Sequence, residues 1–213
     1  MVKKLRKYER PLLQNGCNRY FGPPIYKSTV NADTLVTIKQ MVRESRESVK
    51  DLLCHTTTQN NRLEFENSVL HYAALYEILG HVSSFTKGLN AQDFRDIDEL
   101  QLDNVWMNVQ HANQAIGHHT HEEANYAFVI YVKNELTDPT IGYEYQDRSV
   151  NDPVDGMIEW RYGEVHRCSP NRMLHFPVEG EIVVFPGWLE HQVYPFTEDV
   201  ERVSVAGNIN IVD

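Results

Sequence analysis

The chain has 213 residues and a formal net charge of -10 at pH 7, which argues against broad nucleic-acid binding because a phosphate backbone attracts basic surfaces. Hydrophobic residues make up 41% of the sequence, enough for one domain with a sizeable core. No apolar stretch approaches the roughly 18 residues that a membrane span needs, and the three cysteines are odd in number and widely spaced. We therefore expect a cytoplasmic protein with no membrane or nucleic-acid partner.

The first part of the chain predicts an extended arm followed by helical support over residues 31–90. Prolines and glycines interrupt residues 1–30, where we expect an extended arm or a short edge strand and little other regular structure. From Asp33 to Leu52, apolar residues recur at three- and four-residue steps and predict an amphipathic helix. Residues 62–87 predict a second helix. Its expected apolar face consists of Phe65, Val69, Leu70, Ala73, Tyr76, Leu79, Val82 and Phe85.

Beyond Asn104 the apolar period falls to two, which is typical of β-strands. Turn signals such as Asp138-Pro139 separate short strands, and this spacing favours a sandwich or a closed barrel with the helices against one outer face. We expect a mainly β fold in a single domain over residues 1–213, with its β core over 104–213. The candidate strands are Val105–Val109, Tyr126–Val132, Ile141–Tyr145, Met157–Arg161, Glu181–Phe185, His191–Tyr194 and Arg202–Ile211.

Three histidines from distant parts of the chain are candidate metal ligands. Side chains two apart on an extended segment point the same way, so His119 and His121 can face one point while His118 faces elsewhere. A third ligand is available in His191, which follows a buried strand and the turn at Pro186. Imidazole suits Fe, Zn, Cu or Ni, and three such ligands leave positions for exchangeable molecules.

Arg202 and Ser204 lie on one face of a strand that is otherwise apolar. A guanidinium buried in such a strand needs a partner. A bidentate anionic ligand would provide one, because its two oxygens match the donors of arginine.

The order of these residues resembles the double-stranded β-helix oxygenases that depend on Fe(II) and 2-oxoglutarate. Arg202 follows His191 by 202 − 191 = 11 positions, and Ser204 follows the arginine by two. More narrowly, the sequence is similar to a branch found widely in bacteria and their phages, and the resemblance covers roughly residues 104–211. It is carried by Trp106-x-Asn108, His119-x-His121, Tyr131-Val132, the run from Gly180 to Pro195, and Arg202-x-Ser204-x-Ala206-x-Asn208.

The resemblance implies a jelly-roll, cupin-like barrel and a hydroxylase that uses Fe(II), 2-oxoglutarate and O2, and releases succinate. It implies that His119 and His191 bind the metal and that Arg202 anchors the cosubstrate. Three further residues would assist cosubstrate binding: Ser204, Asn108 and Asn208.

The sequence departs from the usual family pattern at His121, where a typical member has a carboxylate. Two ligand sets are therefore open. His121 binds as a third imidazole, or the motif shifts by two positions so that His121 and Glu123 form the histidine and carboxylate pair. We favour three histidines, because His119 would otherwise lie unpaired beside the metal.

Two other functions are considered. One is a cupin-like metal enzyme that does not use 2-oxoglutarate, and the other is a non-catalytic, metal-binding or virion-associated protein on the same barrel. Arg202 distinguishes the first of these, since only a cosubstrate pocket requires it to point into the barrel. The substrate, whether a small molecule, a peptide or a protein, is left open by the sequence, and so is the oligomeric state.

Overall fold

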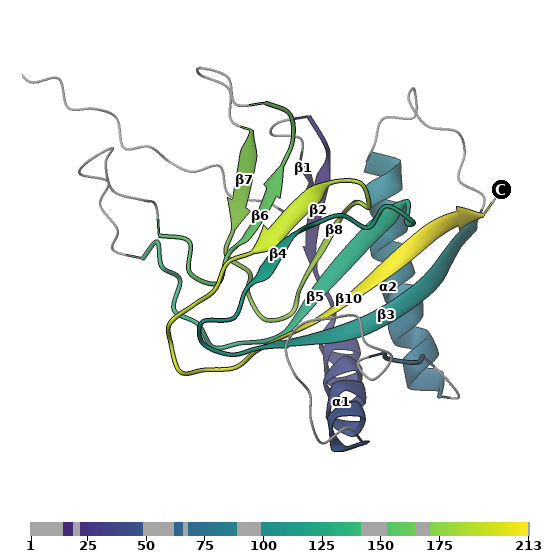
Figure 1. Ribbon diagram of the computed structural model, residues 1–213. Coiled ribbons are helices and arrows are strands. Elements are labelled where there is room, and N and C mark those ends of the chain that lie inside the picture. The colour runs from purple at the N-terminus through teal and green to yellow at the C-terminus, as the bar shows by residue number, and fades with distance from the viewer. Residues whose placement is uncertain are drawn as a thin grey trace, which may run out of the picture.

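Two antiparallel sheets and two helices form three layers in the computed structural model (Figure 1). The structure describes residues 15–18, 22–48, 62–65, 68–88, 99–141, 153–164 and 171–212. The helices pack on one face of a six-stranded sheet, and a four-stranded sheet packs on its other face. Among these residues, no helix is long and apolar enough to cross a membrane.

The strand order is that of a double-stranded β-helix, as the sequence predicted. From β3 onward the chain crosses repeatedly between the two sheets, and all the strand pairs are antiparallel. The six-stranded sheet contains, in order, β1 (Gly16–Asn18), β2 (Ile25–Thr29), β8 (Glu181–Pro186), β5 (Tyr126–Asn134), β10 (Arg202–Val212) and β3 (Glu99–Gln110). The four-stranded sheet contains β4 (Ile116–His119), β9 (Glu190–Val193), β6 (Ile158–Arg161) and β7 (Arg172–His175).

Each helix begins at a polar cap. The side chain of Asn31 accepts a hydrogen bond of 2.8 Å from the backbone of Thr34 at the start of α1 (Ala32–Ser48). The hydroxyl of Ser68 accepts one of 3.2 Å from the backbone of Leu70 at the start of α2 (Val69–Gly88). Both helices cover one outer face of the β core, as predicted.

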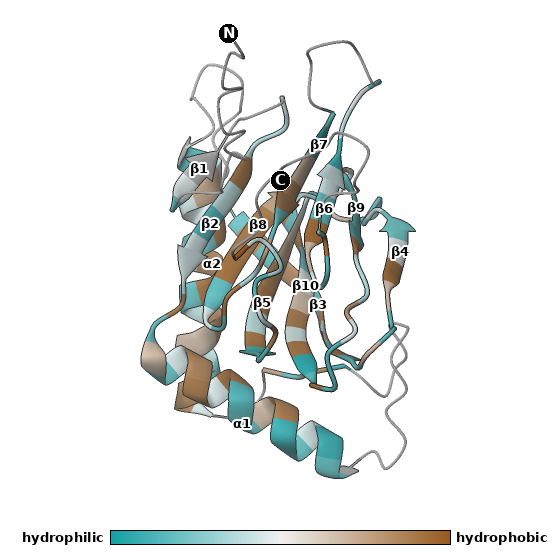
Figure 2. Ribbon diagram, turned by 90° about the vertical axis from the view of Figure 1, so that its left-hand side faces the viewer, coloured by the Kyte–Doolittle hydropathy of each residue, from teal (hydrophilic) through white to brown (hydrophobic). Residues whose placement is uncertain are grey.

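Alternation along β10 divides the interior into two parts. Val203 and Val205 point toward the helices and join the larger hydrophobic core, whereas Arg202 and Ser204 point between the sheets. Figure 2 shows hydrophobic stretches along β8 and β5, two neighbouring strands of the six-stranded sheet. One strand therefore stabilises the helical layer and furnishes the polar side chains of the interior.

Several sequence predictions need correction. Residues 1–30 contain the expected short edge strand, β1, and also β2, which pairs with β8 inside the large sheet, so this segment has more regular structure than predicted. The helix predicted from Arg62 begins only at Val69, because Arg62 forms a bridge to Trp106 at the edge of β3. Two further strands, β4 and β7, were not predicted. Of the strand predicted at Ile141–Tyr145, residues 142–145 lie outside the described residues, and Ile141 ends a turn.

The apolar face predicted for the second helix is also partly wrong. Val82 and Phe85 are buried as expected, but the other buried residues are Ala74 and Ile78. Four members of the predicted face are instead exposed: Ala73, Val69 by 84%, Leu70 by 63% and Tyr76 by 74%. The helix is apolar on its outer side as well, so periodicity alone could not identify the packed face.

We expect Phe85→Ala to lower the free energy of unfolding by about 3–5 kcal/mol, because it leaves a cavity between the helices and the sheet. Phe85 is fully buried and packs edge-to-face on Tyr126, with ring centroids 5.4 Å apart. Urea unfolding monitored by circular dichroism measures the loss. The control is Val36→Ala on the outer side of α1, which should stay within about 0.5 kcal/mol of the parent protein. A loss below about 1 kcal/mol for Phe85→Ala would show that the helical layer unfolds separately.

Candidate metal centre

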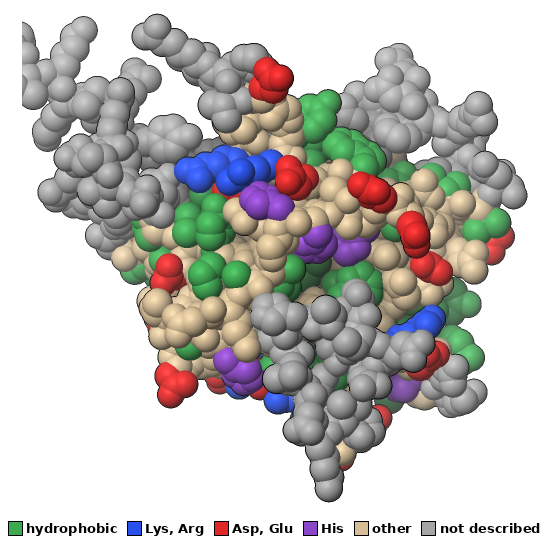
Figure 3. All heavy atoms as spheres, in the orientation of Figure 1, with side chains coloured by type: hydrophobic (Ala, Val, Ile, Leu, Met, Phe, Trp, Pro, Cys, Tyr) green, Lys and Arg blue, Asp and Glu red, His purple; other side chains and the backbone are tan. Residues whose placement is uncertain are grey.

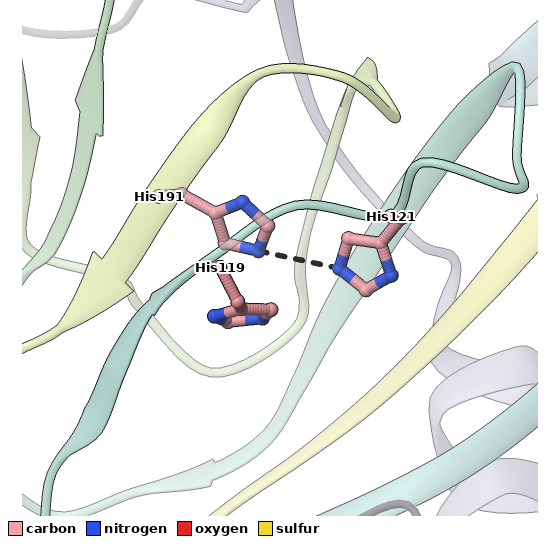
Figure 4. A group of neighbouring side chains, drawn as sticks. All are labelled: His119, His121 and His191. Carbon is pink, nitrogen blue, oxygen red and sulfur yellow. Dashed lines mark hydrogen bonds between the residues drawn. The ribbon is translucent and has the colours of Figure 1, made fainter.

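His119, His121 and His191 meet at one point between the two sheets (Figure 4). Each offers a ring nitrogen, and these three ligand atoms all lie within 4.8 Å of one another. In the described part of the chain, this is the group of histidine, cysteine or carboxylate side chains that is suited to hold a metal ion.

Strand register positions two of the three histidines. His119 ends β4 and pairs directly with His191 on β9, which brings their ring centroids to 4.2 Å. His121 follows in a turn rather than in an extended strand, so the strand alternation expected for the pair does not continue through it. The two side chains nevertheless converge.

The turn that carries His121 is fixed by Gly187. The backbone nitrogen of His121 donates a hydrogen bond of 2.7 Å to the carbonyl of Gly187, in the connection between β8 and β9. A Cβ atom on Gly187 would lie 2.1 Å from the carbonyl oxygen of Ala124 and 2.7 Å from that of His121. Only glycine permits this close approach of the two backbones.

Backbone carbonyls set the tautomer of two histidines. Nδ1 of His119 lies 2.8 Å from the carbonyl of Gly117, and Nδ1 of His191 lies 2.9 Å from the carbonyl of Leu189. A carbonyl oxygen only accepts hydrogen bonds, so each Nδ1 donates and each Nε2 keeps a lone pair. Metal-binding histidines are commonly held in this way by a carbonyl on the second nitrogen.

Burial keeps the imidazoles of His121 and His191 neutral. Loss of hydration, reinforced by the nearby His119, lowers the pKa of His191 to about 3 and the pKa of His121 to about 4. Asn208 lies beside His121 and opposes this shift. Near pH 7 both rings are therefore unprotonated, which is the form that binds a metal.

The histidines open into a cavity of about 480 Å³. Trp106 forms part of its wall and stacks on His121, with ring centroids 5.6 Å apart. Figure 3 shows histidine side chains beside a hollow on this face of the molecule. A ligand of moderate size can therefore reach the point where the three rings meet.

Arg202 points into the same cavity and is 2% exposed. Its Nη1 donates a hydrogen bond of 2.5 Å to the carbonyl of Gly156, and its guanidinium lies 5.8 Å from the centre of the Tyr131 ring. The predicted helpers Ser204 and Asn108 are paired in register across β10 and β3 and also line the cavity. This inward orientation is the one that distinguishes a cosubstrate pocket from a cupin-like site with a surface arginine.

Tyr131 is a candidate site residue to which the sequence assigned no role. It pairs with Ser204 across β5 and β10, lines the cavity, and has a buried hydroxyl without a hydrogen-bond partner among the described residues. Burial raises the pKa of this hydroxyl, while the charge of Arg202 acts in the opposite direction. The hydroxyl stays protonated and can donate to an anion beside Arg202.

Three other predicted or neighbouring residues lie outside the histidine group. Glu123, the alternative carboxylate ligand, is exposed in the turn that follows His121. His118 has its Nδ1 atom 3.5 Å from the carboxylate of Glu190. Asn208 lies beside His121 but is not among the residues that line the cavity.

The arrangement fits a divalent transition metal together with a dicarboxylate. Three imidazole nitrogen donors converge, and they leave space on the cavity side for other ligands of the metal. A guanidinium and an unpartnered tyrosine hydroxyl in the same cavity suit a carboxylate.

Comparison with known proteins agrees with this chemistry. The family model described as "Putative 2OG-Fe(II) oxygenase" matches residues 104–208. No curated protein matches the sequence.

Several solved structures share the fold. A prolyl-4-hydroxylase from Pseudomonas putida is 12% identical, with a TM-score of 0.53 over 89% of this chain and 88% of its own. HygX from Streptomyces hygroscopicus, solved with nickel and 2-oxoglutarate bound, is 9% identical, with a TM-score of 0.57 over 88% and 82%. A 2OG-Fe(II) oxygenase family oxidoreductase from Burkholderia pseudomallei is 14% identical, with a TM-score of 0.53 over 87% and 84%.

We expect Gly187→Ala to weaken metal binding by about 10–100-fold, the range seen when groups that orient metal ligands are removed. The new methyl group must displace the backbone that positions His121. Calorimetric titration with Ni(II) measures the effect. Gly80→Ala on α2, away from the metal centre, is the matched control, since a Cβ there meets no atom within 4 Å, and its affinity should stay within about threefold of the parent protein. Equal affinities for all three proteins would contradict the role given to Gly187.

Proposed function

We propose that this chain, whose residues 104–208 match the model of the 2OG-Fe(II) oxygenase family, is a hydroxylase in which His119, His121 and His191 hold Fe(II) and Arg202 anchors 2-oxoglutarate. The observation that carries the proposal is one cavity lined both by three converging imidazoles and by a buried guanidinium. The two groups match the two ends of a ligand that chelates a metal and carries a second carboxylate.

Each polar side chain has a distinct task in this proposal. The Nε2 atoms of His119 and His191 bind the metal, because their Nδ1 protons are held by backbone carbonyls. Arg202 neutralises the far carboxylate of the cosubstrate, to which the hydroxyls of Tyr131 and Ser204 donate hydrogen bonds. Trp106 keeps the His121 ring in place and excludes water from one side of it.

Fe(II) and 2-oxoglutarate, when bound, supply the oxidising chemistry: O2 is reduced, the cosubstrate becomes succinate and CO2, and a substrate C–H bond becomes C–OH. The protein orients both cofactors and keeps the reacting groups away from bulk water.

The substrate is proposed as a small molecule or a single side chain of a peptide or protein. A volume of about 480 Å³ lies toward the lower end of the range for small-molecule sites, about 300–1,000 Å³, and the cosubstrate occupies part of it. The prolyl-4-hydroxylase among the structural neighbours makes peptidyl proline one chemistry to test. An acidic chain makes a basic or neutral substrate preferable to a polyanion.

We also propose a cytoplasmic location, as expected from the sequence. The support is the cysteine content, since three widely spaced cysteines suit a reducing compartment in which Fe(II) is also maintained.

Anaerobic titration of the Fe(II) protein with 2-oxoglutarate tests the proposed anchor. We expect a weak visible charge-transfer band in the parent protein, no band in Arg202→Ala, and about tenfold weaker cosubstrate binding in Tyr131→Phe, because each loses a hydrogen bond to a charged group. The control is Arg43→Ala on the exposed side of α1, which should titrate like the parent protein. Admission of O2 should then yield succinate. A band that survives in Arg202→Ala would refute the anchor.

Fe(II) affinity of two further variants distinguishes the ligand sets. With three histidine ligands, His119→Ala loses at least about 100-fold in affinity, since loss of an orienting partner alone costs 10–100-fold. Glu123→Gln, in contrast, should bind Fe(II) like the parent protein. The reverse pattern, with Glu123→Gln impaired and His119→Ala unaffected, would establish the shifted set of His121 and Glu123.

A further inference from the structure

The outer side of α2 carries an apolar stripe that no described residue covers. It consists of Val69, Ala73, Tyr76, Gly80, Ser84 and Lys87, which recur at three- and four-residue steps on the side opposite the buried Ile78. Val69 is 84% exposed and Tyr76 is 74% exposed, and beside them Leu70 is 63% and Tyr72 is 49% exposed. We call these six residues the α2 outer stripe.

α1 shows that this composition is not general for the helical layer. Its exposed side carries Lys39, Arg43 and Glu44 and forms surface hydrogen bonds or ion pairs, as expected of a helix facing water. A helix that is apolar on both sides is normally covered on both sides.

We propose that two copies of this protein pair through their α2 outer stripes, with the two helices antiparallel. The stripe is self-complementary in that orientation. Its largest side chain, Tyr76, lies one turn before its smallest residue, Gly80. A two-fold axis perpendicular to the helix, at the level of residue 78, places Tyr76 of each copy over Gly80 of the other. The space at Gly80 is open, since a Cβ atom added there would meet nothing within 4 Å.

Charge favours the same partner. The chain has a net charge of -10, which opposes association through most of its surface. The α2 outer stripe contains no acidic residue, and Lys87 is its only charged member. Glu77 lies on the flank of the helix, where it accepts a hydrogen bond from the backbone of Asn31. Two copies can therefore approach through this stripe without bringing carboxylates together.

The exposed area is sufficient for a modest dimer. A large side chain covers roughly 150–250 Å², so the exposed parts of Val69, Leu70, Tyr72 and Tyr76 amount to about 500 Å² per copy. Two copies bury about 1,000 Å² from these residues, which reaches the lower limit of specific interfaces. We therefore expect reversible association.

Such a pair leaves both metal centres accessible. The helices and the four-stranded sheet lie on opposite faces of the six-stranded sheet (Figure 1), so the six-stranded sheet separates each cavity from the proposed interface. Turnover by each subunit should then be independent of association, and the proposal does not rest on the proposed function.

Sedimentation equilibrium of the full chain over a range of protein concentrations tests the proposal. The average mass of the parent protein should rise from 24.7 kDa toward twice that value. Gly80→Leu fills the space that Tyr76 of the other copy occupies, and Tyr76→Glu places a carboxylate in the stripe. Each should raise the dissociation constant at least about 30-fold, as for a central interface residue.

Separate controls address the folding of the variants and the specificity of the effect for the α2 outer stripe. Gly80→Leu should not destabilise the monomer, because leucine favours helix over glycine and no atom obstructs its Cβ. Val36→Glu on the exposed side of α1 is the matched surface control and should associate like the parent protein. A parent protein that stays monomeric at every concentration overturns the proposal, including the case in which other parts of its own chain cover the stripe. A dimer that persists unchanged in both Gly80→Leu and Tyr76→Glu also overturns it.

Discussion

His119 and His191 lie opposite each other because β4 pairs with β9 in antiparallel register. A slip of one residue in that pairing would turn the side chain of His119 to the other face of the sheet and leave His191 without a neighbour. The backbone hydrogen bond from His121 to Gly187, which lies in the turn between β8 and β9, brings the ring of His121 beside the other two. Two segments that are distant in sequence, residues 119–121 and 187–191, are therefore joined by backbone hydrogen bonds, and the imidazoles converge as a consequence.

β10 connects this centre to the rest of the fold. It is flanked by β3 and β5 in the six-stranded sheet, and its outward residues pack beneath the helices. A guanidinium is costly to bury, but Arg202 is held by the carbonyl of Gly156 and the ring of Tyr131. Because the strand is fixed on both sides, the anchor is oriented before any ligand arrives, so little ordering entropy is lost on binding.

The sequence predicted the chemistry of the site better than its local structure. Histidines and a buried arginine are recognisable in apolar strands because such groups need partners there. β4 was missed because Gly117, His118 and His119 show no apolar alternation. This strand exists only through its pairing with β9, a contact between distant residues that no local pattern contains.

Tyr131 was given no role for a related reason. In the sequence Tyr131 belongs to the family resemblance, but as one aromatic residue in the apolar run of β5 it could equally be a core residue such as Phe128. Only the register with Ser204 shows that its hydroxyl faces the polar part of the interior. The packed face of α2 was predicted incorrectly because both sides of that helix are apolar. The spacing of apolar residues therefore predicts a helix but not which of its sides packs on the sheet.

A histidine in place of the usual carboxylate changes the charge of the site. His121 is partly buried, stacks on Trp106 and has a pKa lowered to about 4 by loss of hydration, so a carboxylate at this position would lose hydration without gaining a cation until the metal bound. Neutral imidazole avoids that cost in the metal-free protein. With three imidazole ligands, however, the two positive charges of Fe(II) would be balanced only by the two negative charges of 2-oxoglutarate. Arg202 would add one further positive charge beside the cosubstrate. Metal and 2-oxoglutarate should therefore stabilise each other in this centre more strongly than where a carboxylate ligand already neutralises part of the metal charge.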